Sequence, residues 1–129
     1  MHNGDEETCH FWVGHLPRHV ADGYFAENYD VEDRDEEPLS PFARDQGVTW
    51  YDHDFLEYGG GDAGSIGELV AGYSYSEQWA DELARRVADQ GLTGVNFFVF
   101  INQEQIAAPR SVQGDGYWLR YMGTIGYRL

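Results

Sequence analysis

The pattern of apolar and polar residues predicts strands near both ends of the chain. Residues 10–16, HFWVGHL, and residues 95–101, VNFFVFI, are apolar on both faces of an extended chain, which is typical of central strands. Residues 117–127, YWLRYMGTIGY, follow the turn signal Asp115-Gly116 and carry bulky side chains on both sides. We expect residues 95–101 and 117–127 to pair as an antiparallel hairpin with a long loop.

A long helix is predicted between these strands, where apolar residues recur at helical spacing. Its apolar side chains come every four residues, at Trp79, Leu83 and Val87. A serine, Ser74 or Ser76, is expected to cap its start, and Gly91 is expected to end it. The apolar stripe of this helix should pack on the sheet.

Three shorter helices are indicated by the residues at their ends. They are expected over residues 17–25, 41–46 and 65–71. Ser40 before Pro41 forms an N-cap and first-turn pair, and Ser65 with Glu68 forms a capping box. The glycine-rich stretch GGGDAG, residues 59–64, is expected to be a flexible connector.

The fold class follows from the order of these elements. Helices and strands do not alternate regularly and no internal repeat is present, so we expect an α+β fold with a mostly antiparallel sheet and helices packed against it. A chain of 129 residues is long enough for one domain with one core. We expect a single domain over residues 1–129, in which residues 1–9 form a mobile acidic tail.

The charge of the chain changes what partners can be expected. There are 23 acidic residues against eight arginines, and residues 1–62 hold 16 of the acids with three arginines, a net charge of −13. Such a field repels nucleic acid and anionic membranes and attracts a basic protein. The alternative is that the acidity is an adaptation to high salt and has no partner.

Targeting signals are not indicated by the sequence. No apolar run approaches the roughly 20 residues that a membrane-spanning helix needs, and the first residues are acidic where a secretory signal would be basic. We therefore expect a cytoplasmic protein. The single cysteine, Cys9, cannot form an internal disulfide and is expected to be a small buried or strand-edge thiol rather than a nucleophile.

The segment GVTWYDHDFLEYGGG, residues 47–61, holds the densest mixture of acidic and aromatic side chains. In an extended chain His53 points away from Asp52 and Asp54, so the three cannot reach one metal ion without further ligands. A metal-dependent hydrolase built on Asp52, His53, Asp54 and Glu57 stays as an alternative. Aromatic anchors among carboxylates favour a protein-binding surface, for which we expect no catalytic residue, metal or cofactor.

Two groups of residues are expected to contact the partner. The first group steers a basic protein by its charge and consists of Asp30, Glu32, Asp33, Asp35, Glu36 and Glu37. The second group lies nearer the centre of the contact and consists of Trp50, Tyr51, Asp52, Asp54, Glu57 and Tyr58. We expect the acidic residues of the N-terminal half to gather on a single exposed patch.

Four segments together resemble a known family. They are HFWVG near the start, SPFARDQGVTWYDHDFLE at residues 40–57, YSYSEQW opening the long helix, and MGTIGY near the end. In this order, with an acidic loop between the first two, they resemble the immunity protein 22 family of bacterial polymorphic-toxin systems, over residues 10–127.

The resemblance implies a small cytoplasmic α+β protein that binds a cognate toxin and so protects the producing cell, without catalysis or a cofactor. It leaves the toxin and the oligomeric state open. Because nucleases are basic where they bind phosphate backbones, we add the hypothesis that the acidic half occludes a nuclease toxin by mimicking its polyanionic substrate.

Overall fold

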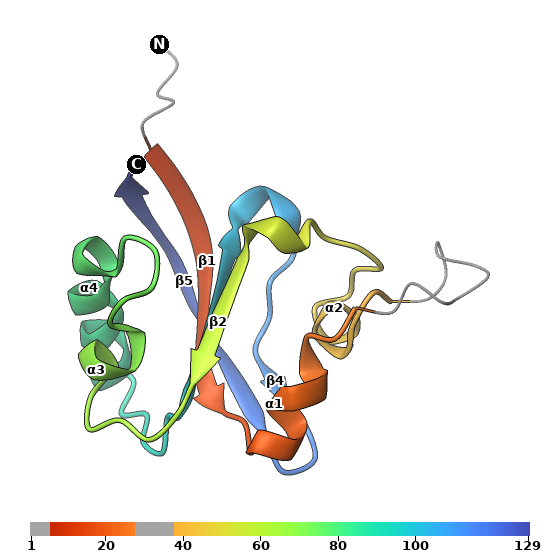
Figure 1. The fold of residues 1–129 in the computed structure, drawn as a ribbon, viewed down its shortest axis with the longest axis horizontal. Coiled ribbons are helices and arrows are strands. Elements are labelled where there is room, and N and C mark those ends of the chain that lie inside the picture. Colours follow the sequence, from red (N-terminus) through yellow and green to blue (C-terminus); the bar gives the residue numbers. More distant parts are fainter. Residues whose placement is uncertain (1–5, 28–37) are drawn as a thin grey trace.

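The computed structural model describes residues 6–27 and 38–129. In these ranges an antiparallel sheet of five strands, in the order β2-β3-β1-β5-β4, has helices on both faces (Figure 1). The strands are β1 (Glu6–His15), β2 (Leu56–Gly60), β3 (Phe97–Asn102), β4 (Val112–Gln113) and β5 (Trp118–Arg128). The helices are α1 (Arg18–Tyr24), α2 (Pro41–Asp45), α3 (Ile66–Val70) and α4 (Ser76–Asp89), with 3-10 turns η1 (His53–Phe55) and η2 (Gln103–Gln105). The expected α+β fold is confirmed.

Strand β1 lies in the middle of the sheet and pairs with both β3 and β5. His10 of β1 lies opposite Ile101 of β3 on one side and Thr124 of β5 on the other. The predicted hairpin between residues 95–101 and 117–127 is therefore wrong, because β1 is inserted between these two strands. A strand covered on both faces gains the most when both of its edges are also hydrogen-bonded.

Two apolar cores form, one on each face of the sheet. Alternate residues of β3 divide between them: Val99 packs on the side of α1 and α2, and Phe98 and Phe100 pack on the side of α3 and α4. The second core holds the predicted stripe of α4, namely Trp79, Leu83 and Val87. The sheet therefore separates two buried layers, as the period-two pattern of β3 requires.

The ends of the helices show which capping predictions hold. The Oγ atom of Ser40 accepts the Ala43 N–H at 3.1 Å, and the Oγ atom of Ser65 accepts the Glu68 N–H at 3.1 Å, so both predicted serine caps are confirmed. The predicted serine cap of α4 is wrong. This helix follows Tyr75, which has a φ of 58° and makes no side-chain cap.

The outer edge of β5 is covered by side chains of α4. Arg86 donates from Nη1 to the carbonyl oxygens of Met122 at 3.0 Å and Thr124 at 2.9 Å. Gln78 bonds both main-chain groups of Arg128, accepting from its N–H at 2.8 Å and donating to its carbonyl at 2.7 Å. These contacts satisfy backbone groups that an edge strand otherwise presents to other chains.

Strand β2 and the start of β1 correct two further expectations. The glycines at 59 and 60 belong to β2 and pair with β3, so they are not part of a flexible connector. A side chain at Gly59 would collide with the hydroxyl of Tyr73, which explains glycine there. Glu6–Cys9 are paired with β5, so the expected mobile tail does not extend over them.

Candidate partner-binding surface

The candidate contact residues that the structure describes lie mainly at one end of the sheet, where β1 begins, β3 ends and β2 begins (top of Figure 1). The N–H of Asp52 donates to Oε1 of Gln105 at 2.8 Å, which joins the segment before β2 to η2 after β3. We name this region the sheet-end surface. We assign to it residues brought to this end by strand pairing, by the Asp52–Gln105 hydrogen bond and by the stacking of Tyr75 on Tyr127, together with their chain neighbours: Glu7, Trp50, Asp52, Asp54, Phe55, Glu57, Tyr75 and Glu104.

The segment that leads into β2 is not extended throughout. His53–Phe55 form the 3-10 turn η1, and Oδ1 of Asp52 caps this turn by accepting the Asp54 N–H at 3.1 Å. The alternation expected for an extended segment therefore begins only at Leu56. Asp54 is left exposed on the turn.

The aromatic residues of this segment differ widely in exposure. Trp50 and Phe55 are 53% and 48% exposed, whereas Tyr51 is 1% exposed. The Tyr51 hydroxyl lies 3.2 Å from Oγ of Ser40, and its ring packs edge-on against Phe42. Tyr51 is thus a core residue, and it is not available as a contact in this conformation.

Glu57 and Tyr58 point to opposite faces of β2, as neighbours in a strand must. Tyr58 stacks on Phe25 with ring centroids 4.1 Å apart, on the side of α1. Glu57 lies on the other side, where its Oε1 accepts the Ser74 N–H at 3.2 Å. The sequence-predicted contact residues therefore do not share one face.

The acidic loop predicted to steer the partner lies outside the described residues. This concerns Asp30, Glu32, Asp33, Asp35, Glu36 and Glu37. Among the described acidic residues of the N-terminal half, Asp22 and Asp62 line a groove at the opposite end of the sheet, beside Arg18. The expectation of one single patch therefore does not hold for the described residues.

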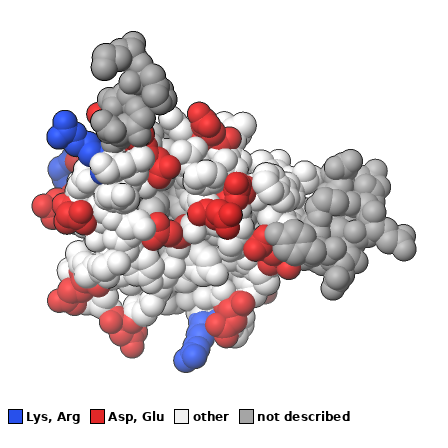
Figure 2. Space-filling model, turned by 45° about the horizontal axis from the view of Figure 1, so that its top comes forward, with Lys and Arg blue, Asp and Glu red and all other residues white. Residues whose placement is uncertain are grey.

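The sheet-end surface is rich in acidic side chains. Figure 2, in which this end comes forward, shows acidic side chains spread over the visible face and basic side chains near its margins. The ion pairs of residues 6–27 and 38–129 join arginines to Asp45, Glu82 and Asp89, and His53 to Glu27. In those ranges no arginine pairs with the carboxylates of the sheet-end surface.

A comparison with protein families matches residues 9–128 to the family described as Immunity protein 22. The chain belongs to this family. No curated protein and no solved structure matches the chain. Membership supports a toxin-neutralising role, in general terms, for this immunity protein.

The immunity protein shows no support for the hydrolase alternative in its described part. There, no group of three or more His, Cys, Asp or Glu side chains is placed to hold a metal ion. The ring of His53 stacks on Tyr51, and its Nδ1 lies 3.5 Å from Oε1 of Glu27. Burial raises the pKa of the Cys9 thiol to about 12, which suits an inert core thiol rather than a nucleophile.

The predicted contact groups omit four residues of the sheet-end surface of this immunity protein: Glu7, Phe55, Tyr75 and Glu104. Glu7 was assigned to the tail, although Glu7, Cys9, Phe11 and Val13 share one side of an extended chain that runs on from the predicted strand. Glu104 comes near the other residues through the pairing of β3 with β1, and Tyr75 does so through its stacking on Tyr127. No local signal marks either residue.

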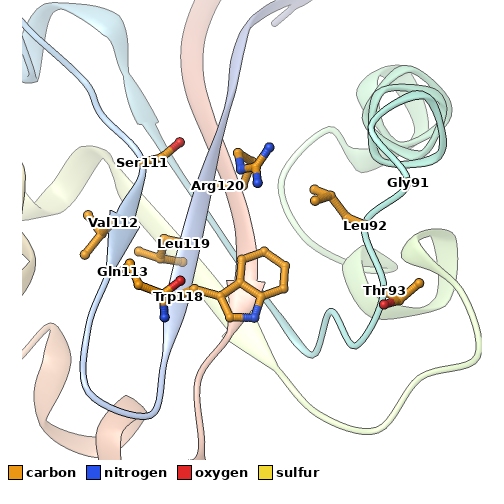
Figure 3. A pocket seen from close by; sticks show the side chains of 9 residues that line it. All are labelled: Gly91, Leu92, Thr93, Ser111, Val112, Gln113, Trp118, Leu119 and Arg120. Atoms are coloured by element: carbon orange, nitrogen blue, oxygen red, sulfur yellow. The ribbon is translucent and has the colours of Figure 1, made fainter.

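A groove of about 490 Å³ lies elsewhere on the immunity protein, between the loop that follows α4 and the β4–β5 hairpin (Figure 3). Trp118, Arg120 and Leu92 contribute side chains to it. The guanidinium of Arg120 donates to Oε1 of Gln90 at 3.1 Å. This groove contains none of the described candidate residues.

The described part of the immunity protein holds no helix with the length and apolar character that crossing a membrane demands.

Proposed function

We propose that this immunity protein neutralises its cognate toxin by binding it directly through the sheet-end surface. The observation that carries the proposal is the pairing of half-exposed Trp50 and Phe55 with carboxylates, among them Asp54, that no described arginine neutralises. Large aromatic side chains are enriched at the centres of interfaces, and carboxylates without an internal cation provide charge complementarity to a basic partner.

The proposed toxin is a basic protein, and a nuclease is the class that fits best. The chain carries a net charge of −15, and a nuclease presents lysine and arginine side chains to the phosphate backbone. An acidic surface can occupy that position in place of the nucleic acid. The acidic stretch from Asp30 to Glu37 would add steering at long range, and the cytoplasm is the proposed site of action.

The test is binding to the toxin module encoded beside this gene, with its catalytic residue inactivated. The two proteins should co-purify at 0.15 M salt and associate more slowly as the salt concentration rises, because the Debye length falls from about 8 Å to about 3 Å at 1 M. The active toxin should lose nuclease activity when the immunity protein is added. A toxin that is bound but remains active, or that is not bound, contradicts the proposal.

Two matched double variants distinguish a local binding surface from a general effect of the acidic charge of the whole protein. Asp54→Asn with Glu104→Gln removes two exposed charges from the sheet-end surface, and Asp22→Asn with Asp62→Asn removes two from the opposite end. The first pair should lower the association rate constant about threefold or more, and the second pair should change it little. Equal effects of the two pairs would favour acidity that serves the whole surface, as in salt adaptation.

A further inference from the structure

Tyr75 presents an aromatic ring at the sheet-end surface in a fixed position. Its φ of 58° places it in the left-handed region, which non-glycine residues adopt rarely. One face of its ring stacks on buried Tyr127, with centroids 5.1 Å apart and an interplanar angle of 23°. The residue is still 38% exposed, so part of its side chain is accessible to a partner.

The backbone on both sides of Tyr75 is held by hydrogen bonds. The preceding N–H, of Ser74, donates to Glu57 of β2, and Gln78 in the first turn of α4 bonds the main chain of Arg128. The ring is therefore pre-organised, and a partner that contacts it has little side-chain entropy to remove.

Two carboxylates are hydrogen-bonded to residues that adjoin Tyr75, and in the described part of the chain their hydrogen-bond donors are neutral groups. Oε2 of Glu7 accepts at 2.6 Å from the hydroxyl of Tyr127, on which Tyr75 stacks. Oε1 of Glu7 accepts from Asn102 at 3.4 Å. Oε1 of Glu57 accepts the N–H of Ser74, the residue before Tyr75, at 3.2 Å. Both carboxylates lie close enough to Cys9 to raise the pKa of its thiol. Among the described arginines none is within ion-pair distance of either, so both negative charges are uncompensated there.

We infer that Tyr75, Glu7 and Glu57 together receive one arginine or lysine side chain of the toxin. A cation over the open face of a tyrosine ring is attracted by the ring electrons, and adjacent carboxylates accept its N–H groups in charge-assisted hydrogen bonds. An arginine fits best, because its planar guanidinium can stack on the ring while its edge faces a carboxylate.

This inference rests on the proposed function and adds to it a contact site formed by the α3–α4 turn and the starts of β1 and β2. Charge complementarity favours a cation as the occupant. An acidic segment would be repelled by the carboxylates of Glu7 and Glu57, and a purely apolar segment would bury these charges without pairing them. The partner is therefore a cationic side chain of the same basic toxin.

The experiment measures the dissociation constant for the inactivated toxin module encoded beside this gene, by calorimetry at 0.15 M salt. Tyr75→Ala should raise the dissociation constant about tenfold or more, and Glu7→Gln about threefold or more, whereas Tyr75→Phe should stay within about twofold because the ring is kept. Thermal unfolding of each variant shows that it is folded, and Trp50→Ala serves as the reference variant for the remainder of the sheet-end surface.

The outcomes separate this inference from the proposed function. If Trp50→Ala weakens binding and Tyr75→Ala does not, the site at Tyr75 is rejected and the proposed function stands. If Tyr75→Phe weakens binding as much as Tyr75→Ala, the ring is not the contact and the inference is also rejected. If the wild-type protein does not bind the toxin module, the proposed function fails and the inference fails with it.

Discussion

The Nδ1 atom of His10 lies 2.8 Å from the hydroxyl oxygen of Tyr121 in the middle of the sheet. The other ring nitrogen, Nε2, lies 3.0 Å from the carbonyl oxygen of Ile106. Because a carbonyl can only accept, Nε2 carries the proton and Nδ1 accepts from Tyr121. His10 is buried as the neutral imidazole, and burial lowers its pKa below the ordinary value of 6.5.

The lowered pKa of His10 predicts that acid destabilises the fold. Between the folded pKa and 6.5 the unfolded chain binds the proton more readily, so stability is complete above pH 6.5 and falls as the pH decreases below it. The slope from this group is at most about 1.4 kcal/mol per pH unit. Urea unfolding at pH 7.5, 6.5 and 5.5 measures it.

Two variants test whether His10 causes this pH dependence. His10→Asn should reduce the slope between pH 6.5 and 5.5, and His19→Gln, at an exposed position of α1, should leave it unchanged. An unchanged slope in His10→Asn would assign the acid sensitivity to other groups.

The buried thiol of Cys9 should be unreactive in the native protein. Its pKa is raised to about 12 by burial first and by the carboxylates of Glu7 and Glu57 in addition, so almost no thiolate is present at pH 8. A thiol reagent such as DTNB should release no chromophore from the folded protein at pH 8 and one equivalent in 6 M guanidinium chloride. Rapid labelling of the folded protein would contradict the buried position of Cys9.

Gly14 should be essential for the close approach of β1 and β5. A Cβ atom at this position would collide with the carbonyl oxygen of Trp118, and backbone cannot move aside as a side chain can. Gly14→Ala should lower the free energy of unfolding by about 2 kcal/mol or more. Denaturant unfolding measures the loss.

The matched control for Gly14 is Gly23, in helix α1. An added Cβ there meets no atom within 4 Å, so Gly23→Ala should raise the free energy of unfolding, by up to about 1 kcal/mol. A similar loss in both variants would mean that the β1–β5 contact is not the cause.

The carboxylate of Asp45 should stabilise the packing of α1 and α2 on the end of the β4–β5 hairpin. Its Oδ2 accepts the hydroxyls of Tyr24 and Tyr117, each at 2.7 Å. Asp45→Asn should cost about 1–3 kcal/mol, because it replaces two charge-assisted hydrogen bonds by weaker ones. The double variant with Tyr24→Phe should lose less than the sum of the two single losses, and additive losses would contradict a shared hydrogen bond.

Local features of the fold could be predicted from the sequence, and its long-range pairings could not. The caps at Ser40 and Ser65 and the helix end at Gly91 depend on the order of a few adjacent residues, so the local sequence is enough to predict them. The position of β1 between β3 and β5 depends on contacts between residues far apart along the chain, and a period-two pattern does not state which strand pairs with which.

Only the part of the candidate surface that lies in one continuous segment could be predicted from the sequence. Trp50 and Asp54 were found because they lie in one short acidic and aromatic segment. Tyr75 carried no such signal, since its left-handed backbone and its stacking on Tyr127 arise from tertiary packing that overrides the ordinary preference of tyrosine. Tyr51 was misplaced because an aromatic ring beside acids can equally well turn inward.

The side chains of Arg86 and Gln78 occupy main-chain hydrogen-bonding groups on the outer edge of β5. An extended segment of another molecule would first have to detach both side chains from β5 before it could add itself to the sheet on that side. That border of the molecule is therefore protected against templating aggregation.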